Sequence, residues 1–430
     1  MSAGPGGTPN APTRSALLHA TTRAALLDVI RGAGNISRVD LTRATGLTGA
    51  TISTVVRRLI DDGLVVETGR AESTGGKPAV LLALAPDSRY AVGADLDHSG
   101  ITYVLSNLGG AIVGRWRRPG FGMESPAEVV ERIGTELTTF MAQVGVDPDR
   151  IVGLGVVAPG PLAGAAAVAG APAGLEAWST YPLADALRRT VTLPVMLEND
   201  ATAAAVGEYW TRSTESSSCF AAVYMGTGIG AGVMVNGDVY RGASSNTGEI
   251  GHLCVDADGP ECWCGSRGCV EVLAGPAAVV AAAREAGMDL RGIGVAEDFA
   301  TVAREAMVGD PRAVAIIQRS ARYIALAIHG LANLMDLDRI ILTGPAFAQA
   351  GSLYVPAIRT QLERGFFART SHAVEVVIST HAAEAAAVGG AALVLQSELA
   401  PRASSTHTAI SGRAVSHGLR QSGPGSVPWG

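Results

Sequence analysis

The chain has 430 residues, of which 47% are apolar, and its 33 basic and 39 acidic side chains give a formal net charge of −6. This length predicts two or three globular units with sizeable cores, and the acidic balance excludes a surface coated with basic residues. The sequence has no apolar run of membrane-spanning length and no signal-peptide pattern at its start. We therefore expect a cytoplasmic protein without a membrane partner.

Small and polar residues dominate both ends of the chain. Residues 1–20 are rich in Gly, Pro, Ala and Thr, and residues 401–430 are similar, so we expect two disordered tails. Near Pro86 the pattern changes from short helices to a long Gly- and Ala-rich alternation of strands and helices. This change predicts one domain over residues 21–85 and a second over residues 86–400.

The first domain opens with a helix whose apolar face contains Leu26, Leu27 and Ile30. Gly32 and Gly34 follow this face and are predicted to end the helix.

Two more helices are predicted by their caps. Ser37 precedes Asp40 by three residues, which is typical of a helix start, and Gly46 marks the end of that helix. Thr48 is the predicted N-cap of the next helix. Its apolar residues follow the spacing of a single buried face, namely Ile52, Val55, Val56, Leu59 and Ile60.

A Gly-containing turn between two helices, the second with a small and polar outer face, is typical of a helix-turn-helix. Strand patterns over residues 64–68 and 79–84 enclose a Gly-rich loop and predict a wing. Residues 23–78 carry eight basic and six acidic side chains, so the acidic excess of the chain lies elsewhere. A small helical protein-interaction domain is the alternative, which the wing disfavours. The residues expected to contact DNA are Arg38, Thr48, Thr51, Ser53, Thr54, Arg57 and Lys77.

The second domain begins with three strand patterns, over residues 90–96, 100–108 and 111–117. A helical stretch and the apolar strand 151–157 follow. A three-stranded meander followed by β-α units predicts an α/β domain like that of the actin-like sugar kinases.

A metal site is predicted by one histidine and three cysteines within residues 252–269. His252 is followed at plus 10, plus 12 and plus 17 by Cys262, Cys264 and Cys269. One nitrogen and three sulfur ligands suit tetrahedral Zn²⁺, and glycines between the thiols allow tight turns. Unliganded surface thiols are the alternative. Cys254 is a competing ligand that spacing alone leaves open.

Polar residues near this motif predict a sugar site. Glu249 and Glu271 flank the metal ligands, and Asn199 and Asp200 follow the strand pattern of residues 194–198. Polyhydroxylated ligands need paired acceptors and donors of this kind. Helix-capping or solvated acids are the alternative for each residue alone.

A glycine-rich segment, GTGIGAG at residues 226–232, follows an apolar strand. Glycines let backbone amides approach a phosphate group, whereas a hairpin without a ligand is nearly as compatible with the same string.

Taken together, these motifs resemble the ROK family of repressors and sugar kinases, over residues 22–398. The metal motif GHLCVDADGPECWCGSRGCVE is the most specific part, and ENDATAAAVGEYW, GTGIGAG and NTGEIGH also match. The run SRVDLTRATGLTGATISTVVRRLIDDGLVVETG, with GGKP, looks like the winged helix-turn-helix of the family's regulators, which its kinases lack. The fold expected is a winged helix-turn-helix followed by a two-lobed, actin-like α/β domain.

The resemblance also implies roles for single residues. Asn199, Asp200, Glu249, His252 and Glu271 would contact sugar hydroxyls, and His252 would bind zinc with Cys262, Cys264 and Cys269. Asp200 falls at the position of the kinases' catalytic base.

The chain departs from the kinase pattern at two phosphate-binding segments. Where the kinases read Asp-x-Gly-Gly-Thr, residues 95–99 read Asp-Leu-Asp-His-Ser, so Asp97 replaces a glycine and would repel phosphate. The second segment is residues 343–346, which read Thr-Gly-Pro-Ala where the kinases carry consecutive glycines, and Pro345 has no amide hydrogen to donate.

We therefore expect a non-enzymatic, sugar-responsive repressor that binds operator DNA and a sugar or sugar phosphate, as a homodimer or higher oligomer. The alternative is an ATP-dependent sugar kinase with an accessory DNA-binding domain.

Overall fold

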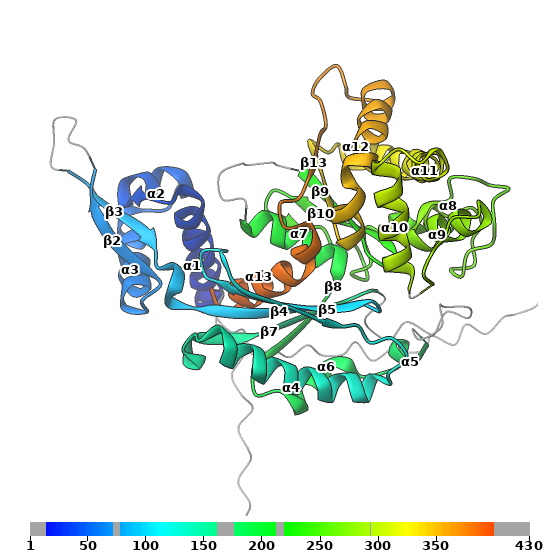
Figure 1. Ribbon diagram of the computed structural model, residues 1–430. Helices are drawn as coiled ribbons and strands as arrows, with labels where there is room; N and C mark the ends of the chain where they lie inside the picture. Colours follow the sequence, from blue (N-terminus) through cyan, green and yellow to red (C-terminus); the bar gives the residue numbers. More distant parts are fainter. Residues whose placement is uncertain (1–13, 72–77, 161–175, 212–218, 293, 400–430) are drawn as a thin grey trace, which may run out of the picture.

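The structure is a computed structural model that describes residues 14–71, 78–160, 176–211, 219–292 and 294–399 (Figure 1). The two-lobed α/β part of the chain lies beside a small N-terminal unit of helices and a short sheet (Figure 1). The predicted tail at residues 401–430 lies outside the described residues.

The N-terminal unit is a winged helix-turn-helix with a three-stranded sheet of order β1-β3-β2. Its elements are α1 (Arg14–Ala33), β1 (Ile36–Ser37), α2 (Arg38–Thr45), α3 (Gly49–Asp61), β2 (Val65–Arg70) and β3 (Val80–Leu84). Strand β1 was not predicted from the sequence. The wing tip, including Lys77, lies outside the described residues.

The predicted helix caps are confirmed. The Ser37 hydroxyl accepts a hydrogen bond from the Asp40 backbone N–H at 3.2 Å, and Gly46 ends α2 in the left-handed conformation. The Thr48 hydroxyl accepts from the Thr51 N–H at 3.3 Å and caps α3. These bonds satisfy donors that a helix start leaves unpaired.

Two expectations about α1 were wrong. The helix begins at Arg14, so residues 14–20, predicted to be tail, are helical. Gly32 lies inside the helix, because Gly34, with φ of 68°, takes the left-handed conformation that ends it.

Each lobe of the α/β part is built on a five-stranded sheet. Lobe I contains β4 (Tyr90–Leu96), β5 (Gly100–Asn107), β6 (Ile112–Pro119), β7 (Ile151–Ala158), β8 (Val195–Asn199), α4 (Pro126–Val144), α5 (Glu176–Ser179) and α6 (Leu183–Thr190). Lobe II contains β9 (Cys219–Met225), β10 (Ile229–Val235), β11 (Asp238–Val239), β12 (Arg339–Thr343), β13 (Glu375–Ile378), α8 (Val270–Ala274), α9 (Pro276–Glu285), α10 (Val295–Met307), α11 (Pro311–Met335) and α12 (Pro345–Gly365).

The two sheets have the same strand order. Lobe I is ordered β6-β5-β4-β7-β8 and lobe II β11-β10-β9-β12-β13. In each, an antiparallel three-stranded meander is followed by two strands that pair in parallel. This repetition confirms the predicted actin-like architecture. Among the described residues, no helix has the length and hydropathy needed to span a membrane.

Two central helices, α7 (Asp200–Thr211) and α13 (Ala385–Leu399), join the lobes (Figure 1). Helix α7 packs on β9 and β10 of lobe II, and α13 packs on β4 and β7 of lobe I. The helices touch through their backbones, because a Cβ added at Gly389 would lie 1.6 Å from the Ala203 carbonyl oxygen. One added at Gly207 would lie 2.7 Å from the Ala385 carbonyl oxygen. Only glycine fits at these two crossings.

We expect Gly389→Ala to destabilise the protein by about 1–3 kcal/mol or more, since the added methyl group overlaps backbone atoms of α7. Gly330→Ala is the matched control: Gly330 is also helical but has no atom within 4 Å of the added Cβ. That control should be stabilising by about 0.5–1 kcal/mol. Chemical denaturation measures both free energies, and equal effects would contradict this account of the contact.

Candidate functional site

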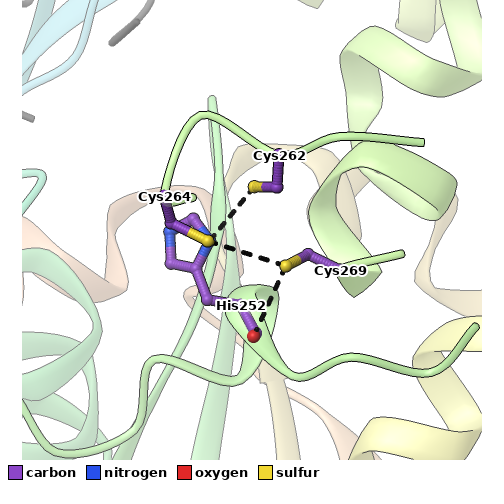
Figure 2. A group of neighbouring side chains, drawn as sticks. All are labelled: His252, Cys262, Cys264 and Cys269. Atoms are coloured by element: carbon purple, nitrogen blue, oxygen red, sulfur yellow. Dashed lines mark hydrogen bonds between the residues drawn. The ribbon is translucent and has the colours of Figure 1, made fainter. Parts of the chain in front are cut away.

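The predicted metal ligands lie together in lobe II. The ligand atoms of His252, Cys262, Cys264 and Cys269 all lie within 4.8 Å of one another, and the side chains converge on one point (Figure 2). The Cys262 Sγ lies 3.6 Å from His252 Nδ1, and the Cys264 Sγ lies 3.7 Å from the Cys269 Sγ. Four donors at these separations can surround one metal ion. Cys254, the competing ligand, is exposed and does not belong to the group.

Tight turns hold the cysteine segment in place. Gly265 and Gly268 have positive φ angles of 92° and 58°, as the sequence predicted for the turns between the thiols. A Cβ at Gly268 would lie 1.6 Å from the Asp256 carbonyl oxygen, so this glycine also permits a close backbone approach.

The metal segment is tied to one of the predicted sugar-site acids. Trp263, between two of the cysteines, donates its indole N–H to the Glu271 carboxylate at 3.1 Å. The Trp263 ring meets the His252 ring edge-on, with centroids 4.8 Å apart. The other Glu271 oxygen accepts the backbone N–H of Ile229 at 3.2 Å. A metal that fixes His252 therefore also fixes the surroundings of Glu271.

Three segments meet at Gly160, after β7. A Cβ at Gly160 would lie 3.3 Å from Asn199 Nδ2 and 3.4 Å from Glu249 Oε1. Asn199 ends β8 of lobe I, whereas Glu249 directly precedes the turn of 3-10 helix η3 (Ile250–His252) in lobe II. The structure thus brings predicted sugar-site residues together from both lobes. Gly160 was missed because no sequence pattern distinguishes it from other loop glycines.

Asp200, the first residue of α7, has unusual electrostatics. Burial raises the pKa of its carboxyl to about 7, and the negative charges of Glu249 and Asp97 act in the same direction. The backbone N–H of Ala201, at 2.7 Å, opposes the shift. Asn199 Nδ2 also donates to Asp200, at 3.0 Å. A carboxyl group of this kind changes protonation state near neutral pH.

Hydrogen bonds between the lobes involve two acids that sequence reasoning did not assign to any contact. The Thr227 hydroxyl of lobe II donates to the Asp97 carboxylate of lobe I at 2.7 Å. The Tyr224 hydroxyl donates to Asp95 at 3.1 Å. Burial raises the pKa of Asp95 well above its usual range, and Asp97 and Asp200 add to the effect. Asp97 was expected only to repel phosphate, and its role between the lobes could not be read from spacing.

The glycine-rich segment 226–232 is mostly strand. Only residues 226–228 form the turn between β9 and β10, where the Gly226 N–H bonds to the Gly228 carbonyl at 3.1 Å. Gly230 and Gly232 lie within β10, and a Cβ at Gly232 would lie 2.3 Å from the Ala201 carbonyl oxygen. The glycines of β10 therefore allow α7 to pack closely on the strand.

The residues predicted to contact DNA lie on the winged helix-turn-helix. Thr48, Ser53, Thr54 and Arg57 are exposed on α3 or its cap, and Thr51 is half-buried. The opposite face of α3 is the predicted apolar one. Its buried residues are Ile52, Val55, Val56 and Leu59, and Ile60 is half-buried. Arg38 forms an ion pair with Glu67 of β2 at 3.1 Å. In the part of the chain that the structure describes, the outer face of α3 is exposed and can meet a ligand.

The fold and the site define a two-lobed, sugar-kinase-type domain preceded by a winged helix-turn-helix. The ROK family model matches residues 92–397 and the MarR family model matches residues 20–73. The chain belongs to the ROK family.

Known transcriptional regulators and known sugar kinases are both similar to this chain. The xylose repressor of Bacillus subtilis (strain 168) is 26% identical over 361 residues, spanning 84% of this chain and 91% of the repressor. A solved ROK family transcriptional regulator, a homolog of the E. coli MLC protein, has a TM-score of 0.68 at 24% identity, over 89% of this chain and 98% of its own. The ROK family glucokinase from Streptomyces griseus, in complex with glucose and AMPPNP, has a TM-score of 0.58 at 26% identity, over 71% and 98%.

We expect the wild-type protein to bind about one metal ion per chain and Cys264→Ser to lose it, because the cluster then has only three strong ligands. Metal content should fall from about one ion per chain towards zero, as measured by elemental analysis after dialysis against a mild chelator. Cys254→Ser is the matched control, since Cys254 lies outside the cluster. If the control loses as much metal, the ligand set is wrong.

Proposed function

We propose that this protein is a sugar-responsive transcriptional repressor. Its α/β domain binds a sugar or sugar phosphate and controls how the winged helix-turn-helix binds operator DNA. The observation that carries the proposal is the combination in one chain of an exposed, polar α3 face with a polar site lined from both lobes. The likeness to the xylose repressor of Bacillus subtilis supports it, because that relative spans both parts of the chain.

Operator DNA is read by the outer face of α3 in this proposal. Its small side chains let the helix approach the base edges, and Thr51, Ser53, Thr54 and Arg57 supply hydrogen bonds. Arg38, Thr48 and the wing residue Lys77 would contact the DNA backbone. One such helix reads few base pairs, so a homodimer that reads two half-sites would give useful specificity.

We expect Arg57→Ala to weaken operator binding by about 1–3 kcal/mol while changing affinity for random DNA far less, because base contacts carry the sequence preference. An operator selected from a random duplex library serves as the probe, with fluorescence anisotropy as the measurement. Lys77→Ala should weaken both DNAs similarly, and Arg364→Ala, an exposed change on α12, should weaken neither. Equal losses on both DNAs for Arg57→Ala would contradict the assignment.

The sugar is held by Asn199, Asp200, Glu249, His252 and Glu271 in this proposal. Hydrogen bonds from hydroxyl groups to carboxylates contribute about 1.5–3 kcal/mol each, so a few of them suffice for selective binding. Zn²⁺ bound by His252, Cys262, Cys264 and Cys269 would be structural. With four protein ligands it has no open position for chemistry, and it supports the sugar site through Trp263 and Glu271.

We expect sugar affinity to rise by up to about tenfold between pH 6 and pH 8, because the Asp200 carboxyl, with a pKa of about 7, accepts hydroxyl hydrogens far more strongly when ionised. The negative charges of Glu249 and Asp97 act on the same carboxyl and raise its pKa further. Calorimetry measures the affinity across this range. Asp200→Asn should weaken binding and remove the rise, yet leave sugar-free operator binding near wild type. An unchanged pH profile in the variant would assign the effect to another group.

Kinase activity is not part of the proposal. The Thr227 hydroxyl at the glycine turn is bonded to Asp97, and the Gly344 N–H next to Pro345 is bonded to the Ala382 carbonyl at 2.8 Å. Groups that would stabilise phosphoryl charge therefore already have protein partners, and the Asp97 charge opposes a phosphate.

We expect no ATP consumption above background with glucose, xylose or N-acetylglucosamine, measured by a coupled ADP assay with an active glucokinase as the positive control. Asp97→Gly removes the repelling carboxylate and should raise the affinity for a non-hydrolysable ATP analogue. Sugar-dependent turnover by the wild-type protein of the order of one per second or faster would favour the kinase alternative.

A further inference from the structure

Helix α7 extends from the proposed sugar site to the winged helix-turn-helix. Asp200 is its first residue, and Tyr209 and Trp210 are in its last turn. Twelve helical residues span about 18 Å. The two ends of one helix therefore contact the two parts of the molecule whose binding events must be coupled.

The helix is held so closely that its ends cannot move independently. All residues from Ala201 to Glu208 are buried, and its backbone touches α13 at Gly389 and β10 at Gly232. Near its C-terminal end, the buried Glu208 carboxylate accepts a hydrogen bond from the Ser379 hydroxyl beyond β13. A helix with such contacts shifts as a unit, because close-packed interfaces transmit displacement rather than absorb it.

The far end of α7 meets α1 through Arg31. The Arg31 side chain is only 7% exposed, although it carries a charge. Its guanidinium lies 4.3 Å from the centre of the Trp210 ring and donates to the Trp210 backbone carbonyl. Trp210 itself is fully buried. This contact combines cation–π attraction with a charge-assisted hydrogen bond.

A second link lies beside the first. Asp28 of α1 accepts a hydrogen bond from Arg31 at 2.8 Å and another from the Tyr209 hydroxyl at 3.2 Å. Asp28, Arg31, Tyr209 and Trp210 thus form one connected group, with two residues from each helix. We call this group the α1–α7 junction. It joins α7 to α1, which packs on α2 and β3 of the winged helix-turn-helix and also on α13.

We propose that the α1–α7 junction transmits sugar binding to the DNA-binding unit, with Arg31 as the positioning residue. A sugar that engages Asp200 biases the position of α7, and the junction converts this into a bias on the orientation of α1. This inference rests on the proposed function. Among the described residues, the interactions of the junction involve no DNA-reading and no sugar-site side chain, so its loss should affect the coupling between the two ligands and leave each binding event intact.

The test is Arg31→Met in the full-length protein, with the selected operator and with glucose, xylose and N-acetylglucosamine as probes. Methionine keeps an apolar stem over Trp210 but removes the charge and the hydrogen bonds. In the wild type, the effective sugar should change operator affinity by about 5- to 150-fold. In Arg31→Met the change should fall to about twofold or less, while sugar affinity without DNA and operator affinity without sugar each stay within about threefold of wild type.

Two further variants keep the test decisive. Arg23→Met is the matched control, because Arg23 also lies on α1 but pairs with Asp62 inside the winged helix-turn-helix, at 2.8 Å. It should retain the full sugar effect. Tyr209→Phe removes only the hydroxyl that bonds to Asp28, so it should fold even if Arg31→Met does not. It should lower the coupling by a few fold, about what one hydrogen bond contributes.

Reciprocal binding separates the outcomes. Calorimetry of the sugar with and without operator must give the same coupling factor as operator binding with and without sugar. If the wild type responds and both Arg31→Met and Tyr209→Phe respond equally well, the junction inference is wrong and the proposed function stands. If no sugar changes operator affinity in the wild type, the proposed function is wrong, and the junction inference with it.

Discussion

The backbone contact between α7 and α13 is the constraint on which the rest of the structure depends. Each helix belongs to the packing of a different sheet, and the glycines at their crossing bring the two backbones together without side chains between them. The two lobes are therefore joined by direct backbone packing of α7 against α13. Asp200 at one end of α7 and Trp210 at the other take their positions from this packing, so the site geometry and the placement of α1 have a common origin.

The same close packing of the lobes brings two acids of lobe I within hydrogen-bond distance of lobe II. Asp95 and Asp97 lie at the end of β4, where they receive hydroxyl groups from Tyr224 and Thr227 of the opposite lobe. Buried carboxyl groups are costly unless hydrogen-bonded or protonated. Here both acids accept a hydroxyl hydrogen bond from the opposite lobe, and burial raises the pKa of Asp95 well above its usual range. Asp95 uses only one of its oxygens in this way, because its Oδ1 atom is buried without a hydrogen-bond partner among the described residues.

Local patterns predicted much of this fold. Helix caps at Ser37 and Thr48, the apolar face of α3 and the spacing of the metal ligands are each decided within about twenty residues, so the sequence was sufficient. Contacts between residues that are far apart in the sequence could not be predicted. Arg31 and Trp210 are separated by 179 positions, and Asp97 and Thr227 by 130, so no periodicity relates them. For the glycines of β10, a phosphate loop and a hairpin without a ligand both stayed open, because a string cannot distinguish a ligand from a packed helix as the reason for a missing side chain.

An enzyme of this fold must open after each turnover to release product, and its nucleotide phosphates supply contacts between the lobes. A regulator has no turnover, and it benefits from an arrangement that the sugar alone can bias. The Asp97–Thr227 and Asp95–Tyr224 hydrogen bonds supply contacts between the lobes from within the chain. In the proposed coupling, the free energy that a bound sugar must provide is about 1–3 kcal/mol, the range of a typical coupling. One or two hydrogen bonds to Asp200 and Glu249 lie in that range. In the proposed repressor, Asp97 would therefore oppose a bound phosphate and also hold the lobes together through its hydrogen bond with Thr227.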